Sequence, residues 1–161
     1  MSGYYGAHGG GGRQYDDYVD VWTDGSCPGN GQYNRGGIGI YWGRNHPWNF
    51  SDRAEGRTNN SCEIEAARIA IEIAKSYGVE KLRINTDSKF LFDSMVKWMP
   101  QWLQNDWENS RGEEVINRRD FERLNDELDG SIRVFWKFVY GHSGDRGNEE
   151  ADRLAKDGAR S

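Results

Sequence analysis

The chain has 161 residues, of which 35% are hydrophobic, and its formal net charge at pH 7 is −5. This length and composition favour one globular domain with a core of ordinary size, and the charge argues against a protein that holds nucleic acid by bulk positive charge. No apolar run approaches the roughly 18 residues of a membrane span, and the amino terminus lacks a signal-peptide core, so we expect an intracellular protein with no membrane partner.

Residues 1–17 are rich in glycine and tyrosine, a composition that cannot bury enough surface to offset the entropy of ordering. We therefore predict a disordered tail over residues 1–17 and a single domain over residues 18–161. The two cysteines, Cys27 and Cys62, lack the spacing of a disulfide framework or a zinc site, which predicts reduced thiols.

The first predicted strand begins at Tyr18. Its alternating β-branched and aromatic residues favour an extended chain as far as Asp24, and Gly25 is expected to end the strand there. Asp24 is therefore expected at the carboxyl end of a strand.

Two further strands are predicted over residues 36–42 and 47–53, so residues 18–53 should form an antiparallel meander. The glycines at positions 36, 37 and 39 resemble a phosphate loop, but no P-loop lysine follows them. We attribute them to close packing of backbones.

The rest of the chain alternates helices with strands. Apolar residues recur at helical spacing over 60–77, and a short strand over 81–86 leads into Asp87. The remaining predicted elements are a helix over 88–98 that Pro100 ends, a loop over 101–112, a helix over 115–128, a strand over 132–139 and a helix over 148–159. This order predicts an α/β fold in which a five-stranded mixed sheet, with a three-strand antiparallel arm and a parallel half, has helices on both faces.

Two of the predicted strands lead into an aspartate, Asp24 and Asp87. If the strands are neighbours about 5 Å apart, both carboxylates lie at the sheet edge where open α/β sheets bind ligands. Two aspartates at one sheet edge repel each other, and a divalent cation would give a reason for them to lie together; Mg²⁺ suits carboxylate and water ligands. Glu63 and Asp152 are candidates to complete the site. Helix capping is the alternative, because Asn60 and Glu63 have capping-box spacing and a helix dipole favours acids such as Asp152.

Five short motifs are highly specific when they occur together in this order. They are Thr23-Asp-Gly-Ser26, Thr58-Asn-Asn-Ser-Cys-Glu63, Thr86-Asp-Ser88, Gly141-His-Ser-Gly144 and Asn148-Glu-Glu-Ala-Asp-Arg-Leu-Ala155. In their order and spacing the chain resembles the type 1 ribonuclease H family, specifically its cellular, eukaryotic-like catalytic domain, and the resemblance implies an RNase H-like fold. The catalytic residues that it implies are the metal-binding carboxylates Asp24, Glu63, Asp87 and Asp152, and the loop histidine His142, which assists proton transfer or product release. Glu65 has no counterpart in the family and is left out.

The family's activity, which the resemblance implies, is endonucleolytic hydrolysis of the RNA strand of RNA/DNA hybrids. Two Mg²⁺ ions, for which Mn²⁺ can substitute, activate the attacking water and stabilise the leaving 3′-oxygen, and the products carry 5′-phosphate and 3′-hydroxyl ends. Two other hypotheses remain open. One is a catalytically weak or silent hybrid-binding module of the same fold, and the other is an unrelated α/β binding domain whose acids cap helices.

A nuclease that cuts RNA only opposite DNA must read 2′-hydroxyl groups on one strand and their absence on the other. The resemblance implies three groups of hybrid-binding residues: Asn30, Asn59 and Asn60 at the minor groove; Arg57, Thr58 and Asn117 in a phosphate pocket; and Phe90, Trp98 and Trp102 in an aromatic channel. Burial in the core is the alternative for Trp98 and Trp102, which lie one helical turn apart.

One stretch departs from the family pattern. Where relatives carry a lysine-rich protrusion, residues 104–114 hold four acids and one base, which predicts loose, poorly processive hybrid binding. Residues 1–17 are too few for the family's separate hybrid-binding domain, so a recruiting protein or a separate domain is an expected partner. We expect a monomer in the nucleus or mitochondria, or in the cytoplasm if this is a natural short form.

Overall fold

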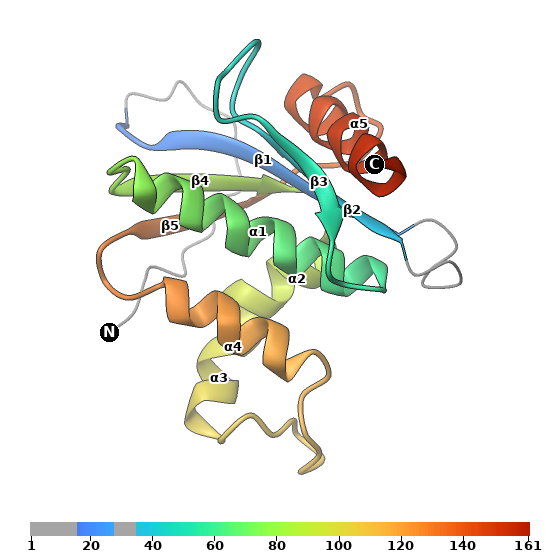
Figure 1. Cartoon of the computed structure of the whole chain (residues 1–161). Helices are drawn as coiled ribbons and strands as arrows, with labels where there is room; N and C mark the ends of the chain where they lie inside the picture. Colours follow the sequence, from blue (N-terminus) through green and yellow to red (C-terminus); the bar gives the residue numbers. More distant parts are fainter. Residues whose placement is uncertain (1–15, 28–34) are drawn as a thin grey trace.

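The computed structural model describes residues 16–27 and 35–161. The predictions for residues 1–15 and for Asn30 lie outside these ranges. Within them five strands form one sheet: β1 (Val19–Ser26), β2 (Gly36–Tyr41), β3 (Phe50–Ala54), β4 (Lys81–Thr86) and β5 (Arg133–Phe138). The strand order is β3-β2-β1-β4-β5, and β1 to β3 pair antiparallel whereas β1, β4 and β5 pair parallel. The predicted mixed sheet and meander are confirmed (Figure 1).

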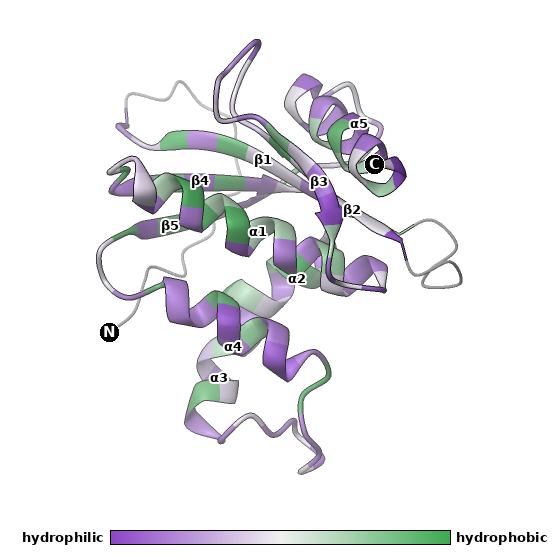
Figure 2. Cartoon of the chain, in the orientation of Figure 1, coloured by the Kyte–Doolittle hydropathy of each residue, from purple (hydrophilic) through white to green (hydrophobic). Residues whose placement is uncertain are grey.

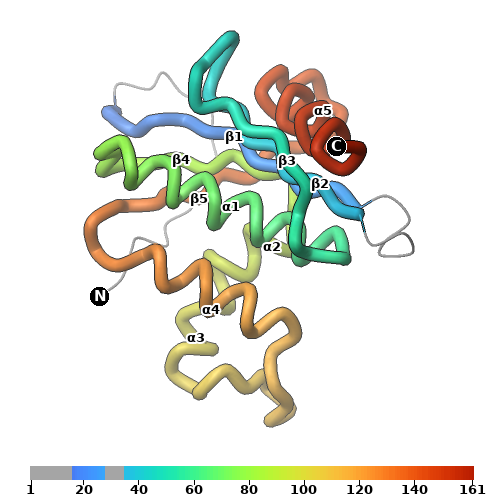
Figure 3. Tube along the Cα trace, viewed as in Figure 1, coloured from blue at the N-terminus to red at the C-terminus, as the bar shows by residue number. Residues whose placement is uncertain are grey.

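Helices cover both faces of the sheet, as predicted. The helix α1 (Asn59–Ser76) packs against β1 and β2, and α4 (Arg118–Glu127) packs against α1. On the other face α5 (Arg146–Arg160) contacts β1, β2 and β3, an arrangement that the chain trace in Figure 3 shows. Hydrophobic stretches run along β1, β4 and α1 (Figure 2), where the core lies. In the described ranges, no helix is long and apolar enough to cross a membrane.

Glycines on β2 let α5 approach the sheet closely. A Cβ atom at Gly37 would lie 1.9 Å from the carbonyl oxygen of Ala155, and one at Gly39 would lie 2.1 Å from that of Ala151. Either contact is too short for any side chain. Close backbone packing, the predicted use of these glycines, is confirmed.

The strand β1 continues past Asp24, so the prediction that Gly25 ends it is wrong. Gly25 pairs with Ile38 and Ser26 pairs with Gly37. What Gly25 provides is room, because a Cβ atom there would lie 2.3 Å from the backbone carbon of Cys62 on α1. The glycine brings the first turns of α1 against the end of β1.

The helix that begins after β4 does not stop at Pro100, and this prediction is also wrong. It runs through α2 (Lys89–Asp93), a π-helical turn (Ser94–Trp98) and α3 (Met99–Gln104). The π turn has the Met99 N–H donating to the Ser94 carbonyl, and Pro100 then lies in the first turn of α3, where its missing N–H costs no hydrogen bond. Residues 101–104 are consequently helical rather than part of a loop.

The helix α4 is shorter than the predicted span of 115–128. Asn117 adopts a left-handed conformation with φ of 65°, so the helix begins only at Arg118. At the other end of the domain, Asp17 accepts a hydrogen bond from Lys81 Nζ at 3.0 Å, and Asp16 pairs with Arg83. Ion pairs therefore tie residues 16 and 17 to β4.

Candidate active site

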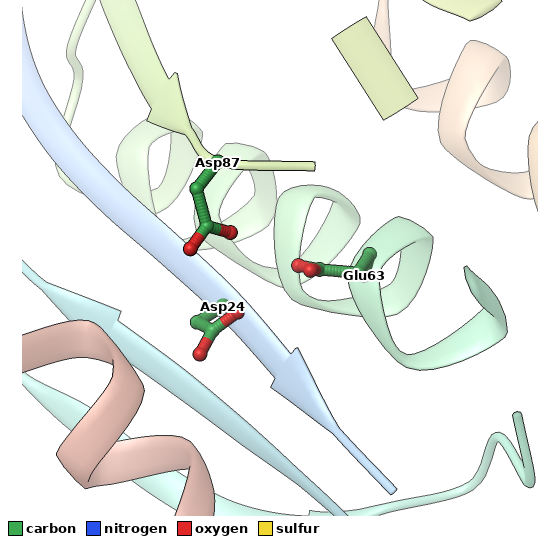
Figure 4. Close-up of side chains that lie close together, drawn as sticks. All are labelled: Asp24, Glu63 and Asp87. Atoms are coloured by element: carbon green, nitrogen blue, oxygen red, sulfur yellow. The ribbon is translucent and has the colours of Figure 1, made fainter. Parts of the chain in front are cut away.

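Three acidic side chains from three different elements meet at one end of the sheet. Asp24 comes from β1, Glu63 from α1 and Asp87 from the end of β4, and they point toward one another in Figure 4. One carboxylate oxygen from each lies within 4.8 Å of the other two. The predicted convergence of Asp24, Glu63 and Asp87 is thus present.

The sheet register places the two aspartates side by side. Trp22 on β1 pairs with Asn85 on the parallel neighbour β4, and Asp24 and Asp87 each follow two residues later. Alternation along a strand puts residues two apart on the same face. Parallel pairing alone therefore brings these two carboxylates together.

Glu63 reaches the aspartates because the backbone of Gly25 lies against α1. Its Oε1 accepts a hydrogen bond from the Gly25 N–H at 2.9 Å. The capping alternative is wrong for this residue, since the capping box of α1 consists of Thr58 and Ser61. The carboxylate of Glu63 is therefore available to the acidic site.

Electrostatics at this site disfavour three ionised carboxylates. Burial, the charge of Asp87 and the neighbouring Asp152 raise the pKa of Asp24 to about 8. Burial raises the pKa of Glu63 well above its usual value, and the charges of Asp24 and Asp87 add to this effect. A divalent cation removes this repulsion, and an all-oxygen donor set fits Mg²⁺ or Mn²⁺.

Asp152, the fourth predicted carboxylate, adjoins this group from α5. It lies close enough to Asp24 to help raise the pKa of that carboxyl group, and Lys156 Nζ lies 3.0 Å from its Oδ2. Its alternative role at the start of a helix is wrong, because α5 begins at Arg146 with Asp145 as its cap, and Asp152 lies beyond the first turn. Asp152 therefore lies next to the site, but its carboxylate forms an ion pair with the ammonium group of Lys156.

The predicted loop histidine, His142, is exposed and has a left-handed backbone with φ of 57°. The residue before it, Gly141, packs over Asp87, since a Cβ atom there would lie 3.0 Å from Asp87 Oδ2. The loop that carries His142 thus passes directly beside the acidic group.

Most of the predicted groove and pocket residues surround one hollow of about 450 Å³. Its lining residues are Thr58, Asn59, Asn60, Ile116 and Asn117. Arg57 is exposed but does not line the hollow. Ile116, which is 81% exposed, was missed by sequence reasoning, and its position before Asn117 was the only signal for it.

The predicted aromatic channel divides into a buried part and an exposed part. Trp102 packs on Phe121 with ring centroids 5.2 Å apart, and Phe90 also contacts Phe121. Trp98 is 39% exposed and lies 6.2 Å from Trp102. The core alternative therefore accounts for much of Trp102, whereas Trp98 remains available to a ligand.

Two further residues clarify the site. Glu65 accepts hydrogen bonds from the backbone N–H groups of Glu55 and Gly56, so leaving it out of the site was right. Asn148, by contrast, was missed. It is buried and donates a hydrogen bond to Asp87 Oδ2 at 3.2 Å. The only sequence signal for Asn148 was that it opens the last of the five motifs.

Comparisons with known proteins agree with this geometry. The RNase H family model matches residues 16–160. The chain is 48% identical over 146 residues to Ribonuclease H1 of Homo sapiens, covering 89% of this chain and 51% of the human protein. It is 37% identical over 142 residues to Ribonuclease H of Actinobacillus pleuropneumoniae serotype 5b, covering 88% of this chain and 90% of that protein.

Among solved structures, LC9-RNase H1, a type 1 RNase H with the type 2 active-site motif, superposes with a TM-score of 0.73. It is 26% identical in sequence, and the match covers 88% of this chain and 71% of that one. The chain spans about half the length of the mammalian Ribonuclease H1 proteins that it matches. From the matched family model, the two relatives and the shared fold, the chain belongs to the RNase H family.

Proposed function

We propose that this protein hydrolyses the RNA strand of RNA/DNA hybrids endonucleolytically. The observation that carries the proposal is the convergence of Asp24, Glu63 and Asp87, with Asp152 beside them, in a chain of the RNase H family. The relatives named Ribonuclease H1 and Ribonuclease H support the same activity. Intact acids at all four positions favour an enzyme over a silent binding module.

The acidic residues would hold two Mg²⁺ ions, for which Mn²⁺ can substitute. Such ions supply an activated water and stabilise the charge on the leaving 3′-oxygen, which yields 5′-phosphate and 3′-hydroxyl ends. Asp24, Glu63 and Asp87 would provide the anionic oxygens, and Asp152 would join them when it leaves Lys156. His142, which is exposed on its loop, would move a proton between solvent and the reacting groups.

The hybrid would lie across the hollow and the exposed aromatic residue. Thr58 and Asn117 offer polar groups to a phosphate of the DNA strand, and Asn59 and Asn60 offer amides to 2′-hydroxyl groups of the RNA strand. Arg57, which is exposed and precedes Thr58 in the sequence, would add a positive charge for the phosphate. We infer that the domain acts as a monomer on the hybrid and that a recruiting protein or another domain adds affinity.

The direct test compares three labelled duplexes: RNA/DNA, RNA/RNA and DNA/DNA. With Mg²⁺ we expect cleavage of the RNA strand in the hybrid alone, with 5′-phosphate ends, and no cleavage in EDTA. Binding to the hybrid without cleavage in either Mg²⁺ or Mn²⁺ would contradict the proposal and leave the binding module. Cleavage that persists in EDTA would contradict the role of the metal.

The two tryptophans of the channel should respond differently to truncation. Trp98→Ala removes an exposed ring and should weaken hybrid binding by about 1 kcal/mol, roughly fivefold in Kd, with little change in Tm. Trp102→Ala removes a ring packed on Phe121 and should cost about 3 kcal/mol of stability. Binding titrations with a non-cleavable hybrid and thermal unfolding measure both effects. A Trp98→Ala protein with unchanged Kd would remove Trp98 from the hybrid interface.

The acidic stretch of residues 104–114 should weaken hybrid binding, because its carboxylates repel the phosphates of the hybrid. Asp106→Asn with Glu108→Gln neutralises two exposed acids of this loop and should tighten hybrid binding by about threefold to tenfold at low salt, with less effect at high salt. Asparagine suits the left-handed backbone of residue 106. The matched control is Asp126→Asn, an exposed acid on α4, which should leave Kd unchanged. Equal affinities for the loop variant and the wild type would count against the interpretation.

A further inference from the structure

Asn148 is fixed firmly at the start of α5. Its N–H donates to Asp145 Oδ1 at 2.9 Å, and only 4% of the residue is exposed. The preceding Gly147 packs against the ring of Trp22, because a Cβ atom there would lie 2.2 Å from Trp22 Cε2. The first turn of α5 therefore rests on β1, and Asn148 has little freedom to move.

From this position Asn148 holds one of the site carboxylates. Its Nδ2 donates to Asp87 Oδ2 at 3.2 Å, and the backbone at Gly141 packs against the same oxygen. The donor assignment follows from chemistry, since an ionised carboxylate only accepts hydrogen bonds and an amide donates only through its nitrogen. Asp87 is thus clamped between α5 and the loop of His142.

The chemistry of this clamp differs from that at Asp152. Lys156 pairs with Asp152 through a full positive charge, which competes with a cation for the carboxylate. Asn148 is neutral, so it orients Asp87 while leaving the negative charge of Asp87 to a cation. Hydrogen bonds to ligating carboxylates typically serve this purpose.

The oxygen atom of the same Asn148 amide gives a second indication that this residue serves the acidic site. Asn148 Oδ1 is buried and has no hydrogen-bond partner among the described residues. A buried acceptor without a donor is unfavourable, and a water molecule held at the site would relieve this by donating a hydrogen bond to it. The Asn148 amide therefore donates to a site carboxylate through Nδ2 and keeps Oδ1 free for a water molecule, as expected beside a hydrated ion.

We propose that Asn148 is a positioning residue of the acidic site, which orients Asp87 through Nδ2 and accepts a hydrogen bond from a site water through Oδ1. The inference rests on the proposed function and deepens it. Asn148 does not ligate the ion. It acts through Asp87, so its loss should alter metal affinity and turnover more than substrate binding.

The test is Asn148→Ala, measured first without nucleic acid. Isothermal titration with MgCl₂ should show at least about tenfold weaker metal binding, which is the usual effect of removing such a supporting partner. On a hybrid substrate, kcat should fall about tenfold to 100-fold while KM stays within about twofold. Asn148→Ser, whose hydroxyl is too short to reach Asp87, should show the same losses and replaces the alanine variant if that variant does not fold.

The matched control is Asn49→Ala, in the turn between β2 and β3. Asn49 accepts a hydrogen bond from the Trp42 N–H at 2.6 Å and donates one to the Gly43 carbonyl at 2.8 Å, so its role is structural. This variant should lower Tm and leave metal affinity and kcat unchanged. Asn148 variants that behave in the same way would overturn the inference. If wild-type protein neither binds Mg²⁺ nor cleaves the hybrid, the proposed function itself fails.

Discussion

Replacing Asp24 with asparagine is expected to reduce cleavage of an RNA/DNA hybrid by at least about 1000-fold, equivalent to about 4 kcal/mol of transition-state stabilisation. Asp24 lies between Glu63, Asp87 and Asp152, so an amide at this position removes an anionic oxygen from the centre of the site. Because the lost carboxylate is buried among other acids, the same change should raise Tm in EDTA. Single-turnover cleavage and thermal unfolding in EDTA measure the two effects.

The opposite signs of these two effects distinguish a metal site from a structural cluster. Glu65→Gln is the matched control, because Glu65 lies two residues after Glu63 on α1, is equally buried and accepts hydrogen bonds from backbone N–H groups away from the site. This variant should lose stability and keep its cleavage rate once folded. If Asp24→Asn cleaves hybrids within tenfold of the wild-type rate, the four-carboxylate interpretation is wrong.

Stability without metal is expected to fall as the pH rises from 6 to 8. The pKa of Asp24 is raised from 3.8 to about 8 in the folded protein, so the folded state keeps a proton that the unfolded state has released. The contribution of Asp24 to the free energy of unfolding is fully present below about pH 4. It is lost as the pH rises toward 8. One proton changes the free energy of unfolding by about 1.4 kcal/mol per pH unit, or about 3–5 °C in Tm for a chain of this size.

Thermal unfolding in EDTA at pH 6, 7 and 8 measures this slope. The raised pKa of Glu63 acts in the same direction. Millimolar Mg²⁺ should flatten or reverse the slope, since bound cations favour the ionised carboxylates, and Asp24→Asn should flatten it in EDTA. A Tm that rises with pH in EDTA for the wild-type protein would show that the carboxylates are not desolvated as the structure indicates.

Local patterns in the sequence were sufficient where the structure depends on local interactions. Alternating residues predicted β1 and β4, and helical spacing predicted α1 to within a residue at each end. Because β1 and β4 are parallel neighbours, Asp24 near the carboxyl end of β1 and Asp87 just after β4 lie at one edge of the sheet. The prediction that Pro100 ends a helix was wrong because the π turn before it lets the helix continue, and no local sequence rule indicates that turn.

The sequence alone determined which acids this protein carries, the strands and helices that bear them, and the family that their motifs resemble. The tertiary structure decided how those acids are held. Glu63 accepts a hydrogen bond from Gly25, 38 residues away in the sequence, and Asn148 donates one to Asp87, 61 residues away. Contacts over such separations depend on how closely α1 and α5 pack on the sheet, which glycines such as Gly25 and Gly147 permit. Sequence spacing carries no measure of that distance, so the support of the site could be found only in the folded protein.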